Sequence, residues 1–202
     1  MLVDSVMTRS VVTTEPSSTL QAAAHLMRVG RFRHLPVVHA GGLVGIISDR
    51  DVHQDGSRRV GEVMHAPVIT ATPDMPMEVA ASLLIDNKIG ALPVVDGGTS
   101  TLVGIVSQTD LFGALARVLG GNGPNTRLEV RLDDLPCQLA VIATLAHERH
   151  VNITSVVTLP VACDDPRVHH VVLRVETMVA RPFVEALRAA GVQVDGPDCH
   201  DG

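Results

Sequence analysis

The sequence predicts a mixed α/β (α+β) fold, in which two βαββα repeats pack as a pseudo-twofold module and a βαββαβ domain follows. Three observations lead to this prediction. Residues 1–58 recur as residues 59–119, a glycine-rich stretch at 120–126 indicates a linker, and apolar residues in 127–202 follow strand and helix periods. A chain of 202 residues, 46% of them hydrophobic, has enough apolar material for the cores that this organisation requires.

The composition argues against several classes of function. The net charge of −6 does not suit a strongly basic nucleic-acid-binding protein, and 1% aromatic residues leave little for stacking on bases. No apolar run reaches about 18 residues, so we expect no membrane span, and the N-terminus lacks the features of a signal peptide. Three distant cysteines, Cys137, Cys163 and Cys199, fit neither a disulfide framework nor a zinc pair. We therefore expect a reduced, cytoplasmic setting.

An internal repeat organises the first 119 residues. Matching residues lie 57 positions apart up to the runs 35–38 and 92–95, and 59 positions apart after them. The two additional residues fall in a glycine-rich turn, where insertions are best tolerated. The matches include Val6 and Met7 with Val63 and Met64, Thr13 with Thr70, Pro16 with Pro73, residues 35–38 with 92–95, Ser48 with Ser107, and Asp51 with Asp110.

Each repeat is expected to form one βαββα unit. In the first repeat, Ser18 and Gln21 form a capping box before a helix with an apolar face, and in the second repeat Asp74 and Pro76 mark the corresponding helix start. Short runs rich in β-branched residues on either side of a glycine turn indicate paired strands. Each unit leaves an apolar sheet face exposed, so we expect the two units to bury these faces against each other. The expected helices are 22–29, 79–86 and 109–119, and the expected strands are 35–38, 43–47, 92–95 and 102–106.

The repeated pattern resembles a tandem pair of CBS domains, an arrangement called a Bateman module. Each copy contains Val-Met, a proline, a helix and Leu-Pro-Val-Val. The first copy then continues as Gly-Ile-Ile-Ser-Asp-Arg-Asp to Asp51, and the second as Gly-Ile-Val-Ser-Gln-Thr-Asp to Asp110. The resemblance covers residues 1–119. It implies clefts between the repeats that bind AMP, ADP, ATP, S-adenosylmethionine or, in some members, NAD, and a regulatory role.

A serine and an aspartate stand at the last strand-to-helix junction of each repeat. The positive end of a helix favours phosphate, and a serine hydroxyl there can donate to a phosphate oxygen. An aspartate one turn further on can accept hydrogen bonds from a ribose diol, and the resemblance implies these roles. The alternative is that the serines cap the helices and the aspartates complement the helix dipole. The residues are Ser48 and Asp51, Ser107 and Asp110, with Gly45 and Gly104 permitting close approach of a ligand.

An adenine ring needs an apolar slot with backbone partners. The resemblance implies that the first strand of each repeat forms one wall of this slot and that the Leu-Pro pairs form the other. The alternative is that these are ordinary core residues. The implied residues are Val12, Thr13, Ile69 and Thr70 for the first wall, and Leu35, Pro36, Leu92 and Pro93 for the second.

Phosphate charge also has to be balanced. We expect Arg33 and His34 to lie near a phosphate, which either repeat could hold; the alternative is a solvated basic turn. The second repeat has Gly90 and Ala91 at the corresponding positions, so the two sites should differ.

The residues beyond the linker predict a ferredoxin-like βαββαβ domain. Residues 133–139, with the helix and Val-Asn-Ile that follow, resemble an ACT domain, a family that commonly binds amino acids at subunit interfaces. Cys137 stands where that family usually has glycine, and the alternative role is dimerisation or relay. A CBS pair with an ACT-like tail is similar in arrangement to acetoin-utilisation-type regulators. The expected strands are 127–132, 153–161, 169–176 and 192–194, and the expected helices are 138–150 and 184–190.

These observations predict a non-enzymatic regulatory or sensor protein that binds an adenosine-containing nucleotide in the clefts of the CBS pair. We expect no required cofactor, a homodimer and a regulated partner protein. The alternative is an interaction module with vestigial clefts. Neither His147 and His150 nor the adjacent His169 and His170 supply three converging metal ligands, and Cys137 has no visible base, so neither a metal site nor an enzyme is expected. The nucleotide, the occupied cleft and the mode of assembly stay open.

Overall fold

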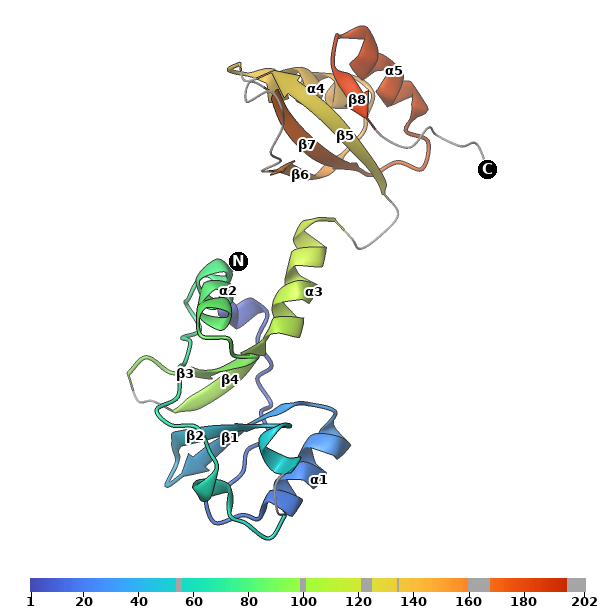
Figure 1. The fold of residues 1–202 in the computed structure, drawn as a ribbon. Coiled ribbons are helices and arrows are strands. Elements are labelled where there is room, and N and C mark those ends of the chain that lie inside the picture. Colours follow the sequence, from blue (N-terminus) through green and yellow to red (C-terminus); the bar gives the residue numbers. More distant parts are fainter. Residues whose placement is uncertain (54–55, 99–100, 121–124, 134, 160–167, 196–202) are drawn as a thin grey trace. The chain divides into compact units, whose positions relative to one another are not determined.

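The computed structural model spans residues 1–202 and describes all of them except 54–55, 99–100, 121–124, 134, 160–167 and 196–202 (Figure 1). The chain divides into two compact units, Met1–Ala114 and Leu115–Gly202. The division falls before the linker predicted at 120–126, of which 121–124 lie outside the described residues. None of the described helices is both long and apolar enough to cross a membrane.

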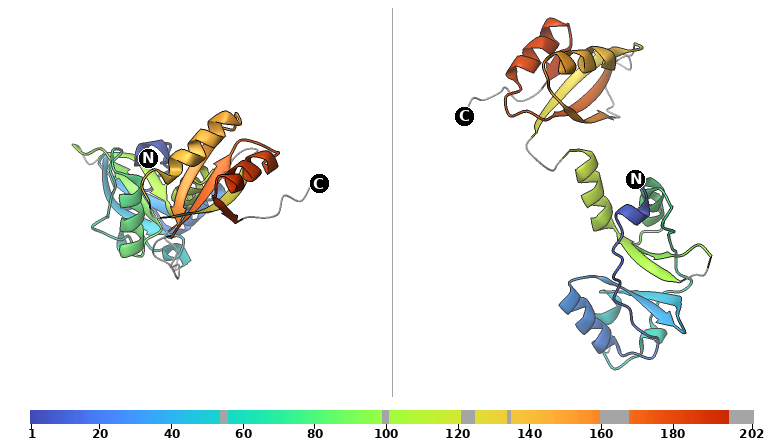
Figure 2. Two further views of the ribbon diagram at one scale, coloured as in Figure 1. Left: turned by 90° about the horizontal axis from the view of Figure 1, so that it is seen from above. Right: turned by 180° about the vertical axis from the view of Figure 1, so that it is seen from behind.

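The first unit contains two similar halves, each with a helix against an antiparallel hairpin. The first half has α1 (Leu20–Gly30), β1 (His34–His39), β2 (Gly42–Ser48) and a short 3-10 helix at Asp51–His53. The second half has α2 (Met77–Asp86), β3 (Ala91–Val95), β4 (Leu102–Ser107) and α3 (Gln108–Val118), which continues past the division. The two hairpins lie next to each other in Figures 1 and 2, with α1 and α2 on their outer sides.

The two hairpins have matching registers. β1 begins with His34 opposite Ser48, and β3 begins with Ala91 opposite Ser107. The register of each hairpin shifts by one residue at a β-bulge, after Val37 in β1 and after Val94 in β3, and four residue pairs precede the shift in both. The duplicated sequence therefore folds into duplicated hairpins.

Two local predictions for this unit were wrong. The N-cap of α1 is Thr19, whose Oγ1 accepts a hydrogen bond from the N–H of Ala22 at 3.2 Å, rather than the expected Ser18. The first strand of each repeat is reduced to a single parallel bridge, Thr14 with Val37 and Ala71 with Val94. These bridges satisfy only one or two backbone groups on each side, so no ladder extends through residues 12–13 or 69–70.

Each half receives part of its core from the sequence of the other repeat. Val3 and Met7, from the N-terminal 3-10 helix Val3–Ser5 and the residues after it, pack into the core around α2, β3 and β4. Val60 and Met64, at and after the 3-10 helix Val60–Glu62, pack into the core around α1, β1 and β2. The start of each sequence repeat therefore belongs structurally to the other half.

Methionines account for the two glycines of the strand-to-helix motif. A Cβ at Gly45 would lie 2.6 Å from Sδ of Met64, and a Cβ at Gly104 would lie 2.6 Å from Sδ of Met7. These glycines make room for a methionine from the other repeat, whereas we expected them to make room for a ligand.

The second unit is a four-stranded antiparallel sheet covered by two helices. Its elements are β5 (Thr126–Asp133), α4 (Gln138–Glu148), β6 (Ile153–Leu159), β7 (Val168–Val175), α5 (Arg181–Ala189) and β8 (Gln193–Asp195). The strand order is β6-β7-β5-β8, which places β7 between the strands that α4 connects. This is the predicted split βαβ arrangement.

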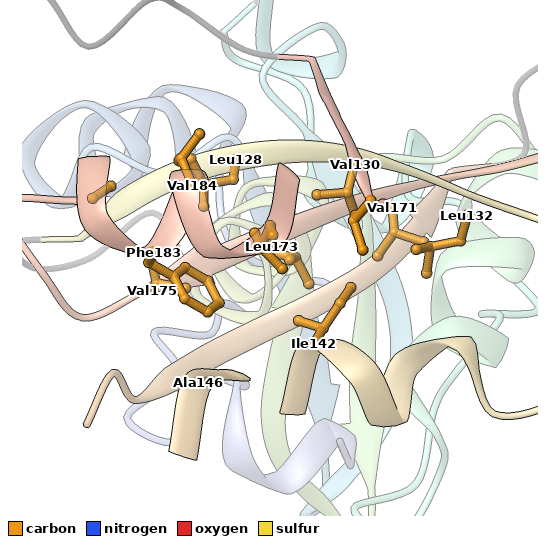
Figure 3. Close-up of a cluster of buried hydrophobic side chains, with 13 residues drawn as sticks. Leu128, Val130, Leu132, Ile142, Ala146, Val171, Leu173, Val175, Phe183 and Val184 are labelled. Carbon is orange, nitrogen blue, oxygen red and sulfur yellow. The ribbon is translucent and has the colours of Figure 1, made fainter. Parts of the chain in front are cut away.

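The core of the second unit lies between the sheet and its helices. Figure 3 shows side chains of β5 and β7, among them Val130 and Leu173, pointing toward Ile142 of α4 and Phe183 of α5. Alternate residues of β5 are buried, as expected for a sheet with one covered face. α5 begins three residues earlier than predicted, because Pro182 is tolerated in the first turn of a helix.

Candidate functional site

The two strand-to-helix junctions contain the same serine–aspartate arrangement. The carboxylate of Asp51 accepts hydrogen bonds from the backbone N–H and the hydroxyl of Ser48, both at 2.7 Å. Asp110 accepts the equivalent bonds from Ser107 at 2.8 and 2.6 Å. Each serine hydroxyl thus donates to Oδ2 of the aspartate three residues further along the chain. A serine hydroxyl has one proton to donate, so a bond to phosphate would compete with the bond to the carboxylate. In this structure each serine hydroxyl holds the carboxylate.

A first cleft opens in front of Asp110 and has a volume of ≈ 310 Å³. Its carboxylate comes from the second repeat, whereas residues 8–12 and 31–34 come from the first. We call it the Asp110 cleft. It is lined by Thr8, Ser10, Val11, Val12, Arg31, Phe32, Arg33, His34, Gly90, Ala91, Ile105, Ser107, Thr109 and Asp110.

A second cleft opens in front of Asp51 and has a volume of ≈ 670 Å³. Here the carboxylate comes from the first repeat, and His65 and Lys88 come from the second. We call it the Asp51 cleft. It is lined by Arg33, His34, Ile46, Ile47, Ser48, Asp49, Arg50, Asp51, His65, Lys88, Ile89, Gly90 and Gln108.

Paired backbone hydrogen bonds bring the two repeats together at each cleft. Thr8 and Ile105 exchange N–H···O bonds of 2.9 and 3.0 Å at the Asp110 cleft. His65 and Ile46 exchange bonds of 2.9 and 3.2 Å at the Asp51 cleft. Thr8 and His65 are 57 positions apart, so the two junctions are related by the sequence repeat.

The structure brings some predicted site residues into the clefts and leaves others outside. Both serines, both aspartates, Arg33, His34 and Val12 line a cleft, whereas Thr13, Ile69 and Thr70 line neither. The Leu-Pro walls were expected to contact adenine, but Leu35 and Leu92 are completely buried in the two cores. Pro36 and Pro93 are also buried, and their carbonyl oxygens accept hydrogen bonds from Thr14 and Ala71. The side chains of both Leu-Pro pairs are therefore core residues, which was the alternative to walls of an adenine slot.

Sequence reasoning missed the residues that enter each cleft from the opposite repeat. Thr8, Ser10 and Val11 at the Asp110 cleft and His65 at the Asp51 cleft were not among the candidates. A signal existed, because Thr8 and His65 follow the repeated Val-Met pair directly. The repeat shows that these positions correspond, but it does not show which half of the structure each one joins.

Asp51 lies in a more charged environment than its counterpart. Burial alone would raise the pKa of its carboxyl group, but the two hydrogen bonds from Ser48 and the contact with His65 outweigh this and lower the pKa below its usual value. Nε2 of His65 lies 3.2 Å from Oδ1 of Asp51. Thr8 occupies the related position at the Asp110 cleft, and no hydrogen bond between described residues engages Oδ1 of Asp110.

Burial lowers the pKa of His34 from its usual value, and the neighbouring Arg33 lowers it further. This lowered pKa favours the neutral form of the His34 imidazole. In the described part of the chain, no three histidine, cysteine or acidic side chains lie close enough together to hold a metal ion.

Known proteins resemble the first part of this chain. The family model for the CBS domain matches residues 3–54 and 60–117. The CBS domain-containing protein YhcV of Bacillus subtilis is 38% identical over 112 residues, which are 52% of this chain and 79% of YhcV. An inosine-5′-monophosphate dehydrogenase of Korarchaeum cryptofilum is 31% identical over 155 residues, but this chain spans only 32% of that enzyme's length.

Solved structures agree with this assignment. AcuB from Vibrio cholerae matches with a TM-score of 0.54 and 32% identity, covering 61% of this chain and 98% of AcuB. The CBS domain pair of MJ0100, solved in complex with 5′-methylthioadenosine and S-adenosylmethionine, matches with a TM-score of 0.54 and 30% identity over 60% of this chain and 97% of that pair. CBSX2, solved in complex with AMP, matches with a TM-score of 0.53 and 26% identity, over 58% of this chain and 97% of CBSX2. With two matched repeats whose hairpins share one register, this chain belongs to the CBS domain family and contains a tandem CBS pair.

Proposed function

We propose that the CBS pair binds an adenosine-containing ligand of the AMP, ATP or S-adenosylmethionine class in the Asp110 and Asp51 clefts, and that the protein is a non-enzymatic regulator. The observation that carries this proposal is the duplicated serine–aspartate pair. Each copy opens onto a cleft that the other repeat completes, so ligand binding touches both repeats at once.

The Asp110 cleft has the chemistry for a nucleoside. Oδ2 of Asp110 is held by Ser107, which leaves Oδ1 to accept hydrogen bonds from the two hydroxyls of a ribose. Val11, Val12 and Phe32 supply apolar surface for a base. The cleft volume of ≈ 310 Å³ falls within the range of about 300–1,000 Å³ typical of small-molecule sites.

Basic side chains at the cleft rims suit an anionic group on the ligand. Arg31 and Arg33 line the Asp110 cleft, and Arg33, Arg50 and Lys88 line the Asp51 cleft. The CBS pairs of MJ0100 and CBSX2 were solved with adenosine-containing ligands, which supports the same ligand class here.

Calorimetric titration of the full chain with AMP, ATP and S-adenosylmethionine tests the proposal. We expect at least one of the three to bind in the micromolar range, equivalent to roughly −8 kcal/mol. Asp110→Asn keeps the side-chain shape but removes the charge, and it should weaken binding at the Asp110 cleft about tenfold through the lost charge-assisted hydrogen bonds. Asp86→Asn, at an exposed position outside both clefts, is the matched control. Absence of heat with all three ligands would refute the proposal.

A regulatory role requires more than binding. A ligand shifts a conformational equilibrium only when its affinity differs between the two states.

We propose that the chain acts as a homodimer in the cytoplasm on a partner protein, with the second unit as an ACT-like dimerisation or relay domain. The βαββαβ order of that unit supports this, as does the left-handed φ of 68° at Cys137, where the ACT family usually has glycine. Native mass spectrometry of the full chain should show a dimer; a monomer at micromolar concentration would contradict this part of the proposal.

A further inference from the structure

Both clefts are lined by the same three residues, Arg33, His34 and Gly90, which we call the shared wall. Gly90 lies 57 positions after Arg33 and therefore occupies the equivalent place in the second repeat. A Cβ at Gly90 would lie 2.6 Å from Cε1 of His34, so the imidazole packs directly on this glycine. The repeat thus supplies two clefts but a single copy of the basic pair.

Each cleft also has a cation that the other cleft lacks. Arg31 lines only the Asp110 cleft and Lys88 lines only the Asp51 cleft. These two residues are 57 positions apart and share the left-handed conformation, with φ of 54° in both. The Asp51 cleft has Arg50 in addition. Arg31 and Lys88 therefore occupy equivalent positions of the two repeats, whereas Arg33 has no basic counterpart in the second repeat.

The guanidinium of Arg33 is available to a ligand. Among the described residues it makes no ion pair and no side-chain hydrogen bond, and only its backbone carbonyl is engaged, by the N–H of Asp49 at 2.8 Å. Burial lowers the pKa of the neighbouring His34, so Arg33 is the permanent positive charge of the shared wall.

We propose that the two clefts bind anionic ligands antagonistically, because the ligand anions contend for Arg33. This inference rests on the proposed function. A guanidinium binds a phosphate most strongly through two parallel N–H···O bonds, and a second phosphate on the same group would lie close to the first. The first anionic ligand binds the guanidinium of Arg33. The second ligand cannot make the same contact and is repelled by the negative charge of the first. Ligands without a phosphate do not contend for Arg33, so their binding to the two clefts is independent.

AMP and 5′-methylthioadenosine are the two probes that distinguish these cases, since they share the nucleoside but only AMP carries a phosphate. In calorimetric titrations of the full wild-type chain, we expect 5′-methylthioadenosine to bind the two clefts independently, so the ratio of its two affinities reports how far the clefts differ without a phosphate. We expect the ratio of the first to the second AMP affinity to exceed the same ratio for 5′-methylthioadenosine by at least about tenfold, the size of one charge-assisted contact. In Arg33→Gln the first AMP step should weaken about tenfold, so that this additional ratio disappears, while 5′-methylthioadenosine binding stays unchanged.

Variants that each alter the aspartate of one cleft test whether both clefts bind AMP. Asp51→Asn and Asp110→Asn should each weaken AMP binding at one cleft about tenfold and leave the other cleft's binding residues intact. Arg28→Gln, a nearby exposed arginine that lines neither cleft, is the control for a general loss of positive charge.

The outcomes separate this inference from the function on which it rests. Wild-type AMP affinities no further apart than those of 5′-methylthioadenosine, or an unchanged first AMP step in Arg33→Gln, overturn the antagonism and leave the proposed function intact. Weaker AMP binding in one aspartate variant with no change in the other also overturns it, because only one cleft is then a site. If neither probe binds the wild type, the proposed function fails, and the antagonism fails with it.

Discussion

The two halves of the CBS pair differ in charge although they share one backbone plan. Their hairpins have the same register, and both serine–aspartate pairs have hydrogen bonds of 2.6–2.8 Å. Around this shared plan, the first repeat has Arg33 and His34 where the second has Gly90 and Ala91, and His65 stands where Thr8 stands in the other cleft. Positions that build the scaffold are duplicated, and positions that set the charge of the clefts are not.

The largest expected effects test the equivalence of the two cores. Leu35 and Leu92 are both completely buried at matching strand positions. Leu35→Ala and Leu92→Ala should each lower the free energy of unfolding by about 2–5 kcal/mol in urea titrations. A loss below about 1 kcal/mol for only one of them would show that the halves are not packed alike.

A smaller effect distinguishes the two methionine contacts. Gly104→Ala places a Cβ 2.6 Å from Sδ of Met7 and 3.2 Å from the backbone oxygen of Thr8, and should cost about 1–3 kcal/mol by thermal or urea unfolding. The three atoms nearest to a Cβ at Gly45, 2.6–3.1 Å away, all belong to the Met64 side chain and none to the backbone, so Gly45→Ala should cost less.

Gly97→Ala is the matched control, since the nearest atom to its Cβ is 4.0 Å away. Equal losses at Gly45 and Gly104 would contradict the proposed role of the Thr8 backbone.

Cys137 extends the comparison to the second unit. Its φ of 68° is unfavourable for any residue with a Cβ, so Cys137→Gly should stabilise this unit by about 1 kcal/mol. Cys137→Ala retains a Cβ and should give no such gain. Stabilisation of the same size by both substitutions, measured by differential scanning calorimetry, would point to loss of the thiol as the cause.

The smallest effect is a pH dependence from the shared wall. The lowered pKa of His34 means that its neutral form is favoured in the folded state, so its stabilising contribution is complete above pH 6.5 and is lost as the pH falls through the lowered value. Arg33 and Arg50 oppose protonation, whereas Asp49 and Asp51 favour it.

His34→Gln should therefore flatten the decline of unfolding free energy between about pH 7 and pH 5. A steeper decline in this variant than in the wild type would contradict the direction assigned to His34.

The sequence was sufficient for the hairpins and for the serine–aspartate motif, because both depend on local patterns, but not for the first strand of each repeat, which is a single bridge. Repeat spacing located the hairpins to within one or two residues, and the serine–aspartate pair could be recognised from its duplication. The exchange of segments between halves was not predictable, because Val3 and Met7 are apolar in either half and only three-dimensional packing decides which core they join. For the same reason Leu35 and Leu92 looked like cleft walls, although the strand places them in the cores.

The central claim is that both serine–aspartate pairs face ligand sites, and amide chemical-shift mapping during an AMP titration of the full chain tests it most directly. The account predicts the largest shifts at residues 48–51 and 107–110 and at the segments that meet them, around Thr8 and His65. Shifts confined to residues 126–195, or an unchanged spectrum at millimolar AMP, would contradict it.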